Sequence, residues 1–259
     1  MKVCEIDRNM MYSVLQHAFN ALQISPRIIE LGVCKGDNAQ QLLERLSPSP
    51  LVLIDSWNAA SIDDYSAFKQ LPPWVDPPET YDFYFGGPIR EQSTWDKLYD
   101  SCVQRFANNP QVQLLRSFSV EAVPLIRATA GEAPFDLIYV DASHQYEFVL
   151  RDLMVFQDLL GPNGCFMLND CCHSAEGLRQ NLGVLEATSN FIKRSDFVPV
   201  ALTNTDWSDV VLARKGSLME QALHWTLVNS DIALVDIPAQ LLPAARLVRG
   251  NQRVHLSFS

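Results

Sequence analysis

The order of hydrophobic and polar positions divides the chain into two kinds of segment. Short, almost continuous apolar runs are typical of strands that are buried on both faces of a parallel sheet. Apolar residues spaced three or four positions apart are typical of amphipathic helices. The runs predict one strand at the start of a strand–turn–helix unit over 27–46, and further strands at 51–57, 112–116, 135–141, 165–170, 197–204 and 208–215.

Segments with helical spacing lie before and between these runs. They predict helices over 5–22, near 94–107, over 145–160 and over 218–228, with a turn at 161–164. Strands that alternate with helices form a mostly parallel sheet with helices on both faces. We therefore expect a doubly wound, seven-stranded, Rossmann-like α/β fold.

Two segments do not follow the alternation. Residues 58–111 are too long for a simple connection and include a part rich in Pro and aromatic residues (71–88), which is expected to be a surface excursion or a lid over a binding site. Residues 216–259 form an apolar appendage, expected to pack on the domain or to contact a second copy in a homodimer. Without a repeat or clear linker, residues 1–259 are expected to form one domain.

Acidic residues stand at the ends of three predicted strands, namely Asp55, Asp141 and Asp170. In open α/β sheets the ligand crevice lies beyond the carboxyl ends of the strands, so these residues are expected to converge on a site. The first strand leads through Glu30 into a turn with Gly32 and Gly36, which would allow the backbone to approach a ligand closely.

This turn lacks both the G-x-G-x-x-G pattern of dinucleotide-binding folds and the G-K-[ST] of a P-loop, which disfavours a Rossmann dehydrogenase. Asp55 could accept hydrogen bonds from the hydroxyls of a ribose, or could serve as a turn or helix-capping residue. The ribose interpretation is favoured because Asp55 follows the glycine turn in the chain.

Composition and charge narrow the class of protein. Apolar residues make up 47% and charged residues 19% of the chain, which supports a large core. The net charge of −10 disfavours nucleic acid or anionic membrane as a partner. Neither a signal peptide nor a membrane span is expected, so we expect a soluble, cytoplasmic protein with six reduced cysteines. The adjacent Cys171, Cys172 and His173 have poor geometry for a zinc site.

Taken together, four segments resemble the successive motifs of class I S-adenosylmethionine-dependent methyltransferases. They are ELGVCKGDNA, LIDSW, FDLIYVDASHQYEFVLRDL and GPNGCFMLND. The D-x-x-H-x-Y pattern after the fourth strand is similar to that of macrocin-type small-molecule O-methyltransferases, more distantly related to the catechol type. The resemblance covers about residues 25–215.

The resemblance implies a role for each matching position. Glu30, Gly32 and the turn to Gly36 would hold the methionine part of the cofactor S-adenosylmethionine. Asp55 would hold its ribose, with Ser56 and Trp57 alongside. Ser117 and Phe118 would contact adenine, and Asp141 would lie close to the reacting centre.

Many relatives also bind a divalent metal, and the equivalent residues here are Asp141, Asn169 and Asp170. Three oxygen ligands suit Mg²⁺, which would bind an acceptor hydroxyl and lower its pKa. The Asn-Asp pair is less anionic than the Asp-Asp pair of some relatives. Alternatively, the acids contact only cofactor or substrate.

His144 stands where catechol-type relatives carry a catalytic lysine, and it is the candidate general base together with Asp141. It could instead orient the loop. His173 is a second candidate base or ligand, and Tyr146 a candidate for the acceptor pocket. The leading hypothesis is methyl transfer to a hydroxyl of a small molecule, as in secondary metabolism. The alternatives are metal-independent transfer to nitrogen or carbon, and a non-catalytic binding subunit with this fold.

Overall fold

The computed structural model describes residues 1–62, 71–250 and 254–259. Parts of the predicted insertion (63–70) and appendage (251–253) therefore lie outside the described residues. The strands are β1 (Lys2–Cys4), β2 (Ile28–Leu31), β3 (Leu51–Asp55), β4 (Val112–Arg116), β5 (Phe135–Val140), β6 (Leu160–Leu168), β7 (Phe197–Thr203), β8 (Val210–Arg214), β9 (Leu234–Asp236), β10 (Arg246–Arg249) and β11 (Val254–Ser257). The α-helices are α1 (Arg8–Ala21), α2 (Asp37–Leu46), α3 (Asp82–Phe85), α4 (Gln92–Phe106), α5 (Ser119–Ala130), α6 (Tyr146–Phe156), α7 (Ala175–Arg179), α8 (Val184–Ile192) and α9 (Leu218–Val228).

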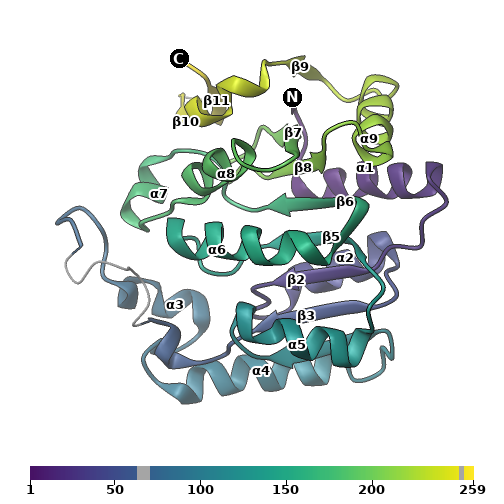
Figure 1. Cartoon of the computed structure of the whole chain (residues 1–259). Helices are drawn as coiled ribbons and strands as arrows, with labels where there is room; N and C mark the ends of the chain where they lie inside the picture. The colour runs from purple at the N-terminus through teal and green to yellow at the C-terminus, as the bar shows by residue number, and fades with distance from the viewer. Residues whose placement is uncertain (63–70, 251–253) are drawn as a thin grey trace.

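The main sheet has the strand order β4-β3-β2-β5-β6-β8-β7-β1-β9 (Figure 1). Strands β4, β3, β2, β5 and β6 are parallel, and β8 runs antiparallel to both β6 and β7. The chain moves outward from β2 to β4 and then returns to β5 on the other side of β2. This reversal places a topological switch point between β2 and β5, where α/β sheets bind ligands.

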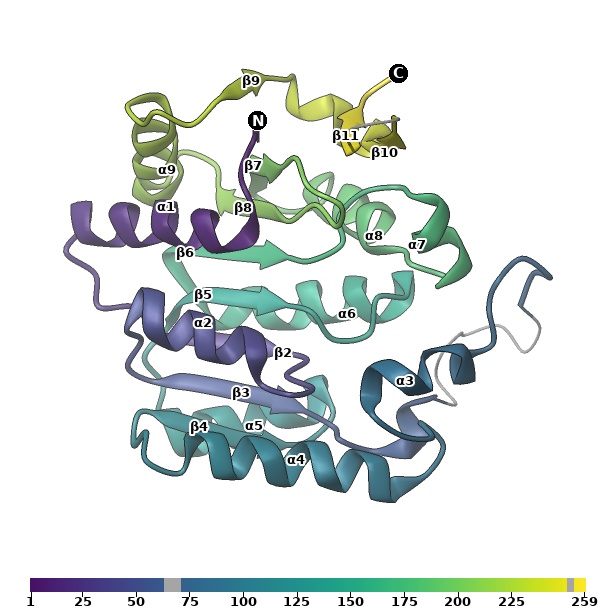
Figure 2. The same ribbon diagram turned by 180° about the vertical axis from the view of Figure 1, so that it is seen from behind.

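Helices cover both faces of this sheet, as the apolar runs predicted. In Figure 1, α5, α6 and α8 lie in front of it, and Figure 2 shows α1, α2 and α4 on the opposite face. Successive strand residues point to opposite faces, so Leu53 packs in the core beneath α1, α2 and α4, while Val52 and Ile54 pack beneath α5 and α6. The predicted doubly wound, mostly parallel arrangement is confirmed.

The prediction of seven strands is wrong, because short strands from the two ends of the chain extend the sheet. Strand β1 is parallel to β7, where Val3 lies opposite Leu202. It is antiparallel to β9, where Val3 lies opposite Val235. The predicted helix over 5–22 accordingly begins only at Arg8, with Asp7 accepting a hydrogen bond from the amide of Met10. Three-residue strands carry too little periodicity to be recognised, and their partners lie about two hundred positions away in the chain.

The predicted turn at 161–164 is also wrong, because these residues lie inside β6. The pairing of β5 with β6 is irregular there, shifting between Phe135 and Leu137, which accommodates the extra residues. The Cβ of any larger residue at Gly164 would lie 2.8 Å from the side chain of Leu160. The glycines therefore serve close packing beside the sheet rather than a reversal of the chain.

The insertion and the appendage both pack on the domain. The insertion contributes α3 and α4, and Trp95 of α4 is buried in the core. The appendage contributes α9, which packs on α1, and a 3-10 helix (Ala239–Ala244) whose Leu242 is fully buried on the other face of the sheet.

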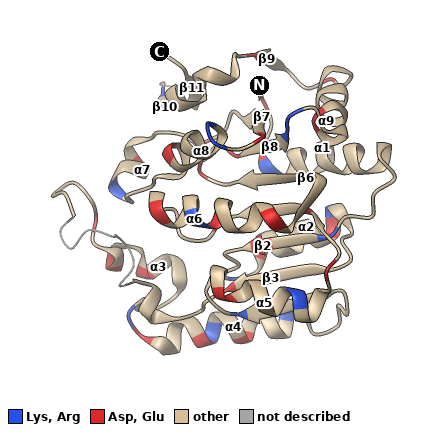
Figure 3. Cartoon of the chain, in the orientation of Figure 1, with Lys and Arg blue, Asp and Glu red and all other residues tan. Residues whose placement is uncertain are grey.

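The surface of the described chain mixes acidic and basic positions along the helices (Figure 3). Among the described residues, the search for membrane-spanning helices found none of sufficient length and hydrophobicity. All six cysteines are free thiols, as expected.

Candidate functional site

The carboxyl ends of β2, β3, β5 and β6 bring the predicted site residues to one edge of the sheet (Figure 2). The turn after β2 and the loop after β5 touch directly. A Cβ on Gly32, which has φ +84°, would lie 2.0 Å from the carbonyl oxygen of Asp141. The space beside Gly32 is thus filled by the backbone of the neighbouring loop, and this glycine fixes Asp141 in place.

Gly36 serves packing in a similar way. It begins α2 with φ +78°, and a Cβ there would lie 2.9 Å from the ring of Phe106 and 3.2 Å from the sulfur of Cys102. At both positions the direction in which a Cβ would point is filled by protein atoms, so packing requires glycine there whether or not a ligand approaches the backbone.

Asp55 ends β3 and holds the glycine turn. Its Oδ2 accepts hydrogen bonds from the amides of Val33 (3.0 Å) and Cys34 (2.9 Å), and its Oδ1 accepts one from the amide of Trp57 (2.9 Å). Burial raises the pKa of Asp55, although these backbone bonds oppose the shift. The turn-residue role weighed at the sequence level is therefore present in the structure.

Trp57 locks the segment that follows. Its indole Nε1 donates to the carbonyl of Cys34 at 2.9 Å, and its ring packs edge-on against Tyr99. It adopts φ +38°, a conformation that is costly for a bulky residue. Trp57 is fully buried and so supports the turn as part of the core.

Ser117 and Phe118 follow β4 beside Asp55. The amide of Ser117 donates to the carbonyl of Asp55 at 2.9 Å, and Phe118 begins α5. Ser56 is half-buried next to Asp55. These positions border the crevice beyond the ends of β3 and β4.

Glu30 is completely buried within β2. Its Oε1 accepts a hydrogen bond from Asn38 at 3.0 Å, whereas Oε2 has no partner among the described residues. Burial raises the pKa of Glu30 to about 8. A buried carboxyl oxygen without a partner is costly, and it is well suited to a cationic ligand group.

His144 joins the two acids that the sequence placed at the reacting centre. Its Nε2 lies 3.2 Å from Oδ1 of Asp141 and 3.6 Å from Oδ2 of Asp170. Burial by itself would lower the pKa of His144, but the hydrogen bond to Asp141 and the charge of Asp170 outweigh it and raise that pKa above 6.5. Burial raises the pKa of Asp170 to about 6, opposed by His144.

The predicted magnesium ligands lie together, but they do not form a magnesium site. The guanidinium of Arg8, at the start of α1, donates from Nη2 to the side-chain oxygen of Asn169, and its Nη1 lies 3.8 Å from Oδ2 of Asp141. The amide nitrogen of Asn169 donates to Asp141 at 3.0 Å. The oxygen through which Asn169 would bind a metal is therefore occupied by Arg8, and His144 stands between the two acids.

The described ranges also hold no cluster of three or more His, Cys, Asp or Glu side chains arranged for a metal ion. As they are arranged, these residues do not fit Mg²⁺, and the positive charge beside Asp141 comes from an arginine.

Sequence reasoning missed Arg8 and its second partner, Asp209. Both carboxylate oxygens of Asp209 accept from Nε of Arg8 at 3.3 Å, and the ring of Tyr139 lies beneath the guanidinium at 5.4 Å. Burial raises the pKa of Asp209 to about 7, opposed by Arg8. The one signal in the sequence was that Asp209 stands at the start of an apolar run predicted to be a strand.

His173 does not join this cluster. It is half exposed, and its Nδ1 lies 3.6 Å from Oε1 of Glu186 on α8. The structure thus separates the two histidines that the sequence offered as bases, and places only His144 between the acids.

The described part of the insertion contacts two elements near the carboxyl ends of the strands. On one side, the carbonyl of Tyr84 accepts a hydrogen bond from Lys35 of the glycine turn, whose ammonium also lies 4.6 Å from the ring centre of Tyr84. On the other side, the amide of Asp76 donates to the carbonyl of Arg179 in α7 at 2.8 Å. These two contacts hold the described part of the insertion against the glycine turn and α7.

Comparison with solved structures shows the fold. An O-methyltransferase from Bacillus cereus, solved in complex with SAH, matches with a TM-score of 0.50 and 14% identity over 81% of this chain and 83% of that one. The N-methyltransferase NodS from Bradyrhizobium japonicum WM9 matches with a TM-score of 0.50 and 11% identity over 80% and 94% of the two chains.

A spermidine synthase solved with the transition-state analogue AdoDATO matches with a TM-score of 0.45 and 14% identity over 84% of this chain. This chain spans 63% of the length of that synthase. A search of curated proteins gave no significant match.

The sequence itself identifies the family. A family model for a methyltransferase domain matches residues 29–171, more than half of the chain, and this range contains the glycine turn, Asp55, Asp141, His144 and the Asn169–Asp170 pair. The chain therefore belongs to the methyltransferase-domain family.

Proposed function

We propose that this enzyme transfers the methyl group of S-adenosylmethionine to a hydroxyl of a small molecule. The observation that carries the proposal is the position of His144, within 3.2 Å of Asp141 and 3.6 Å of Asp170, at the switch point of the sheet. A histidine between two carboxylates is equipped to accept a proton and to be stabilised once it is charged.

The cofactor supplies an electrophilic methyl group when it is bound. Glu30 would hold its ammonium group, because one fully buried oxygen of its carboxyl has no partner within the described part of the chain. Asp55 would hold the ribose hydroxyls, and Ser117 and Phe118 would border the adenine. The unpartnered oxygen of Glu30 supports this assignment, since an ammonium group would satisfy it.

In the proposed reaction the acceptor oxygen attacks the methyl carbon, the carbon–sulfur bond breaks, and the sulfonium becomes a neutral thioether. The hydroxyl proton passes to Nδ1 of His144, because in the neutral imidazole Nε2 carries the hydrogen that faces Asp141 and Asp170. Asp141 and Asp170 stabilise the resulting imidazolium, and Arg8 keeps Asp141 and Asn169 in position. Positioning of the two reactants contributes a large part of the rate.

Calorimetry and a methyl-transfer assay test this function. We expect S-adenosylmethionine to bind the wild type and Asp100→Ala, a variant of an exposed residue on α4, with equal affinity, and to bind Asp55→Asn about tenfold or more weakly. EDTA should leave activity with an accepted hydroxyl compound unchanged, because Arg8 supplies the positive charge. Failure of the wild type to bind S-adenosylmethionine would refute the proposal.

The same His144 could deprotonate an amine or an activated carbon, so the methylated product decides the acceptor atom. Mass spectrometry of products from matched hydroxyl and amine acceptors separates the cases. Methylation of the amine alone would replace the hydroxyl assignment by nitrogen.

A further inference from the structure

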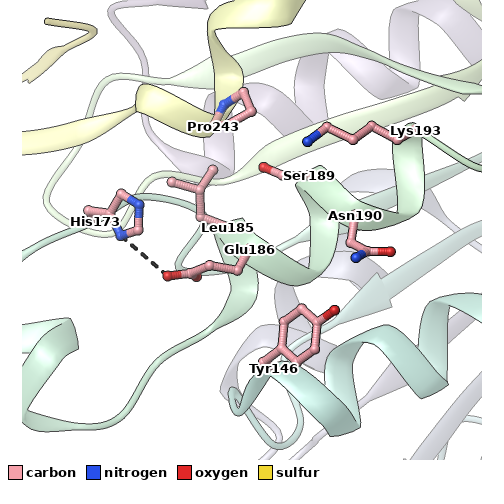
Figure 4. Close-up of a pocket in the computed structure, with 8 residues that line it drawn as sticks. All are labelled: Tyr146, His173, Leu185, Glu186, Ser189, Asn190, Lys193 and Pro243. Atoms are coloured by element: carbon pink, nitrogen blue, oxygen red, sulfur yellow. Dashed lines mark ion pairs between the residues drawn. The ribbon is translucent and has the colours of Figure 1, made fainter.

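A hollow lies along α8, on that side of the proposed reacting centre. It has a volume of about 290 Å³ and is lined by one face of α8 together with Tyr146, His173 and Pro243 of the appendage (Figure 4). A smaller hollow of about 60 Å³ shares His173, Leu185 and Glu186 with it and reaches Asp170. The two hollows are therefore adjacent, and the smaller one is lined in part by Asp170, whose Oδ2 lies 3.6 Å from Nε2 of His144.

The α8 face of this hollow carries polar groups of different kinds. Ser189 is only 7% exposed, and its hydroxyl oxygen is buried without a hydrogen-bond partner among the described residues. Asn190 and Lys193 follow it around the rim, and in Figure 4 the ammonium of Lys193 extends over the hollow on the Ser189 side. An unsatisfied buried hydroxyl beside a lysine is a favourable arrangement for an anionic oxygen.

The other polar groups in the hollow are already partly engaged. Glu186 and His173 face one another at 3.6 Å across its opposite end (Figure 4). Lys193 and Arg194 directly follow α8, in a chain of net charge −10. Tyr146, Leu185 and Pro243 supply apolar surface between the two ends, as in pockets for small organic ligands.

We propose that this hollow binds the methyl acceptor, and that the acceptor is a small hydroxylated molecule with an anionic group. The anionic group would lie between Lys193 and the hydroxyl of Ser189, the apolar body against Tyr146, and the hydroxyl would point along the smaller hollow to Asp170 and His144. This assignment of the acceptor class rests on the proposed function, but binding of the anion in the hollow does not require catalysis.

The appendage gives the hollow its outer wall, which ties acceptor choice to the C-terminal segment. The amide of His173 donates to the carbonyl of Ala245 at 2.9 Å, and the amide of Leu247 donates to the carbonyl of His173 at 2.7 Å. These bonds hold Pro243 opposite α8. The family model matches residues 29–171, so the outer wall of the hollow is formed by residues that the model does not cover.

Ligand-observed NMR with full-length protein and no cofactor tests the proposal. The probes are the three isomers of hydroxybenzoate, the corresponding hydroxyphenyl phosphates and the corresponding hydroxybenzamides, each at millimolar concentration. We expect at least one anionic probe to bind and the corresponding neutral amide to bind at least about fivefold more weakly. Whichever of the carboxylate and the phosphate binds more tightly identifies the anionic group.

Substitutions test whether the probe binds in the hollow. Lys193→Gln should weaken binding of the anionic probe about fivefold or more. Arg194 is a neighbouring exposed cation that does not line the hollow, so Arg194→Gln should leave this affinity unchanged. Ser189→Ala should weaken it about threefold or more while the thermal midpoint stays near that of the wild type. Binding that is absent for every anion, or equal in wild type and Lys193→Gln, would overturn the proposal. Separate calorimetry with S-adenosylmethionine shows whether the proposed function stands in either case.

Discussion

The charge state of His144 should decide how activity depends on pH. The pKa of this imidazole is raised above 6.5 by Asp141 and Asp170, and a base must be neutral to accept a proton. We expect kcat to rise with pH through a midpoint above 6.5. That midpoint belongs to the coupled cluster of His144 and its two acids.

Two variants check this assignment. Asp170→Asn removes one of the charges that raise the pKa of His144, so the midpoint should move down by about 0.5 unit or more. His144→Gln should lower kcat by about 10²-fold or more and leave the affinity for S-adenosylmethionine unchanged. A pH profile of kcat that stays the same in Asp170→Asn would contradict a role for this carboxylate.

Arg8 should be needed for both stability and activity, in separable ways. Asp209 is only 2% exposed at its side chain, so Arg8→Met leaves a buried carboxylate without its cation and should cost about 3 kcal/mol of unfolding free energy. The same variant should lower kcat at least about tenfold, because Asp141 and Asn169 lose their common partner.

The double variant Arg8→Met/Asp209→Asn separates the two effects in urea unfolding and in the kinetic assay. Removal of the unpaired charge should restore most of the stability, but it should not restore kcat. Recovery of both would show that Arg8 acts on stability alone.

Glu30 should destabilise the protein in the absence of cofactor as pH rises. The pKa of this side chain is about 8 in the folded chain against an ordinary 4.5, so the stability contributed by its neutral form is complete below pH 4.5 and is lost as pH rises through about 8. Glu30→Gln should therefore gain stability relative to wild type across this window and show a constant difference above it.

Thermal unfolding over this pH range measures the gain, and calorimetry should show that Glu30→Gln binds S-adenosylmethionine about tenfold or more weakly. A stability difference that does not change with pH would refute the raised pKa.

Among the connections between elements, the contact between the loops after β2 and β5 leaves no room for a side chain at Gly32. Gly32→Ala would bring a Cβ to 2.0 Å from the Asp141 carbonyl and should cost about 3 kcal/mol or more. Gly86 has a similar φ of +79° in the left-handed helical region, and no atom of the described residues lies within 4 Å of a Cβ there, so Gly86→Ala should cost only about 1 kcal/mol. Urea unfolding of the two variants separates backbone strain from steric overlap, and equal losses would contradict the close approach.

At the level of the elements, periodicity located those that are long enough to repeat a pattern. The apolar runs of β3 and β5 and the helical spacing of α1 and α9 were visible in the residues. The three-residue strands β1 and β9 were not, because they are set by pairing between the two ends of the chain. Residues 161–164, predicted as a turn, lie in β6 between Leu160 and Cys165, which pair with Phe135 and Leu137 of β5, and they form the irregularity in that pairing.

Considered as a whole, the molecule depends on its appendage as part of one folded unit. Leu242 is fully buried in the core beneath α8, whereas its neighbour Leu241 is 41% exposed. Leu242→Ala should cost about 2–5 kcal/mol and Leu241→Ala less than about 0.5 kcal/mol in urea unfolding. Equal losses would show that the appendage is not packed as described.

The amino-acid pattern was sufficient for the class of fold and for the edge of the sheet that carries the site. Parallel strands bury both faces and read as apolar runs, and Asp55, Asp141 and Asp170 stand where those runs end. These properties are local, so they can be read from neighbouring residues.

Only the tertiary structure decided how the site residues are used. Asp55 binds the glycine turn, Glu30 keeps one oxygen without a partner, and Arg8 lies beside Asp141 and Asn169 where a metal had been expected. The Arg8–Asp209 pair joins positions 201 residues apart, and a contact of that kind leaves no trace in local spacing. Its existence depends on the close packing of α1 and β8 around Tyr139, which is a property of the folded chain.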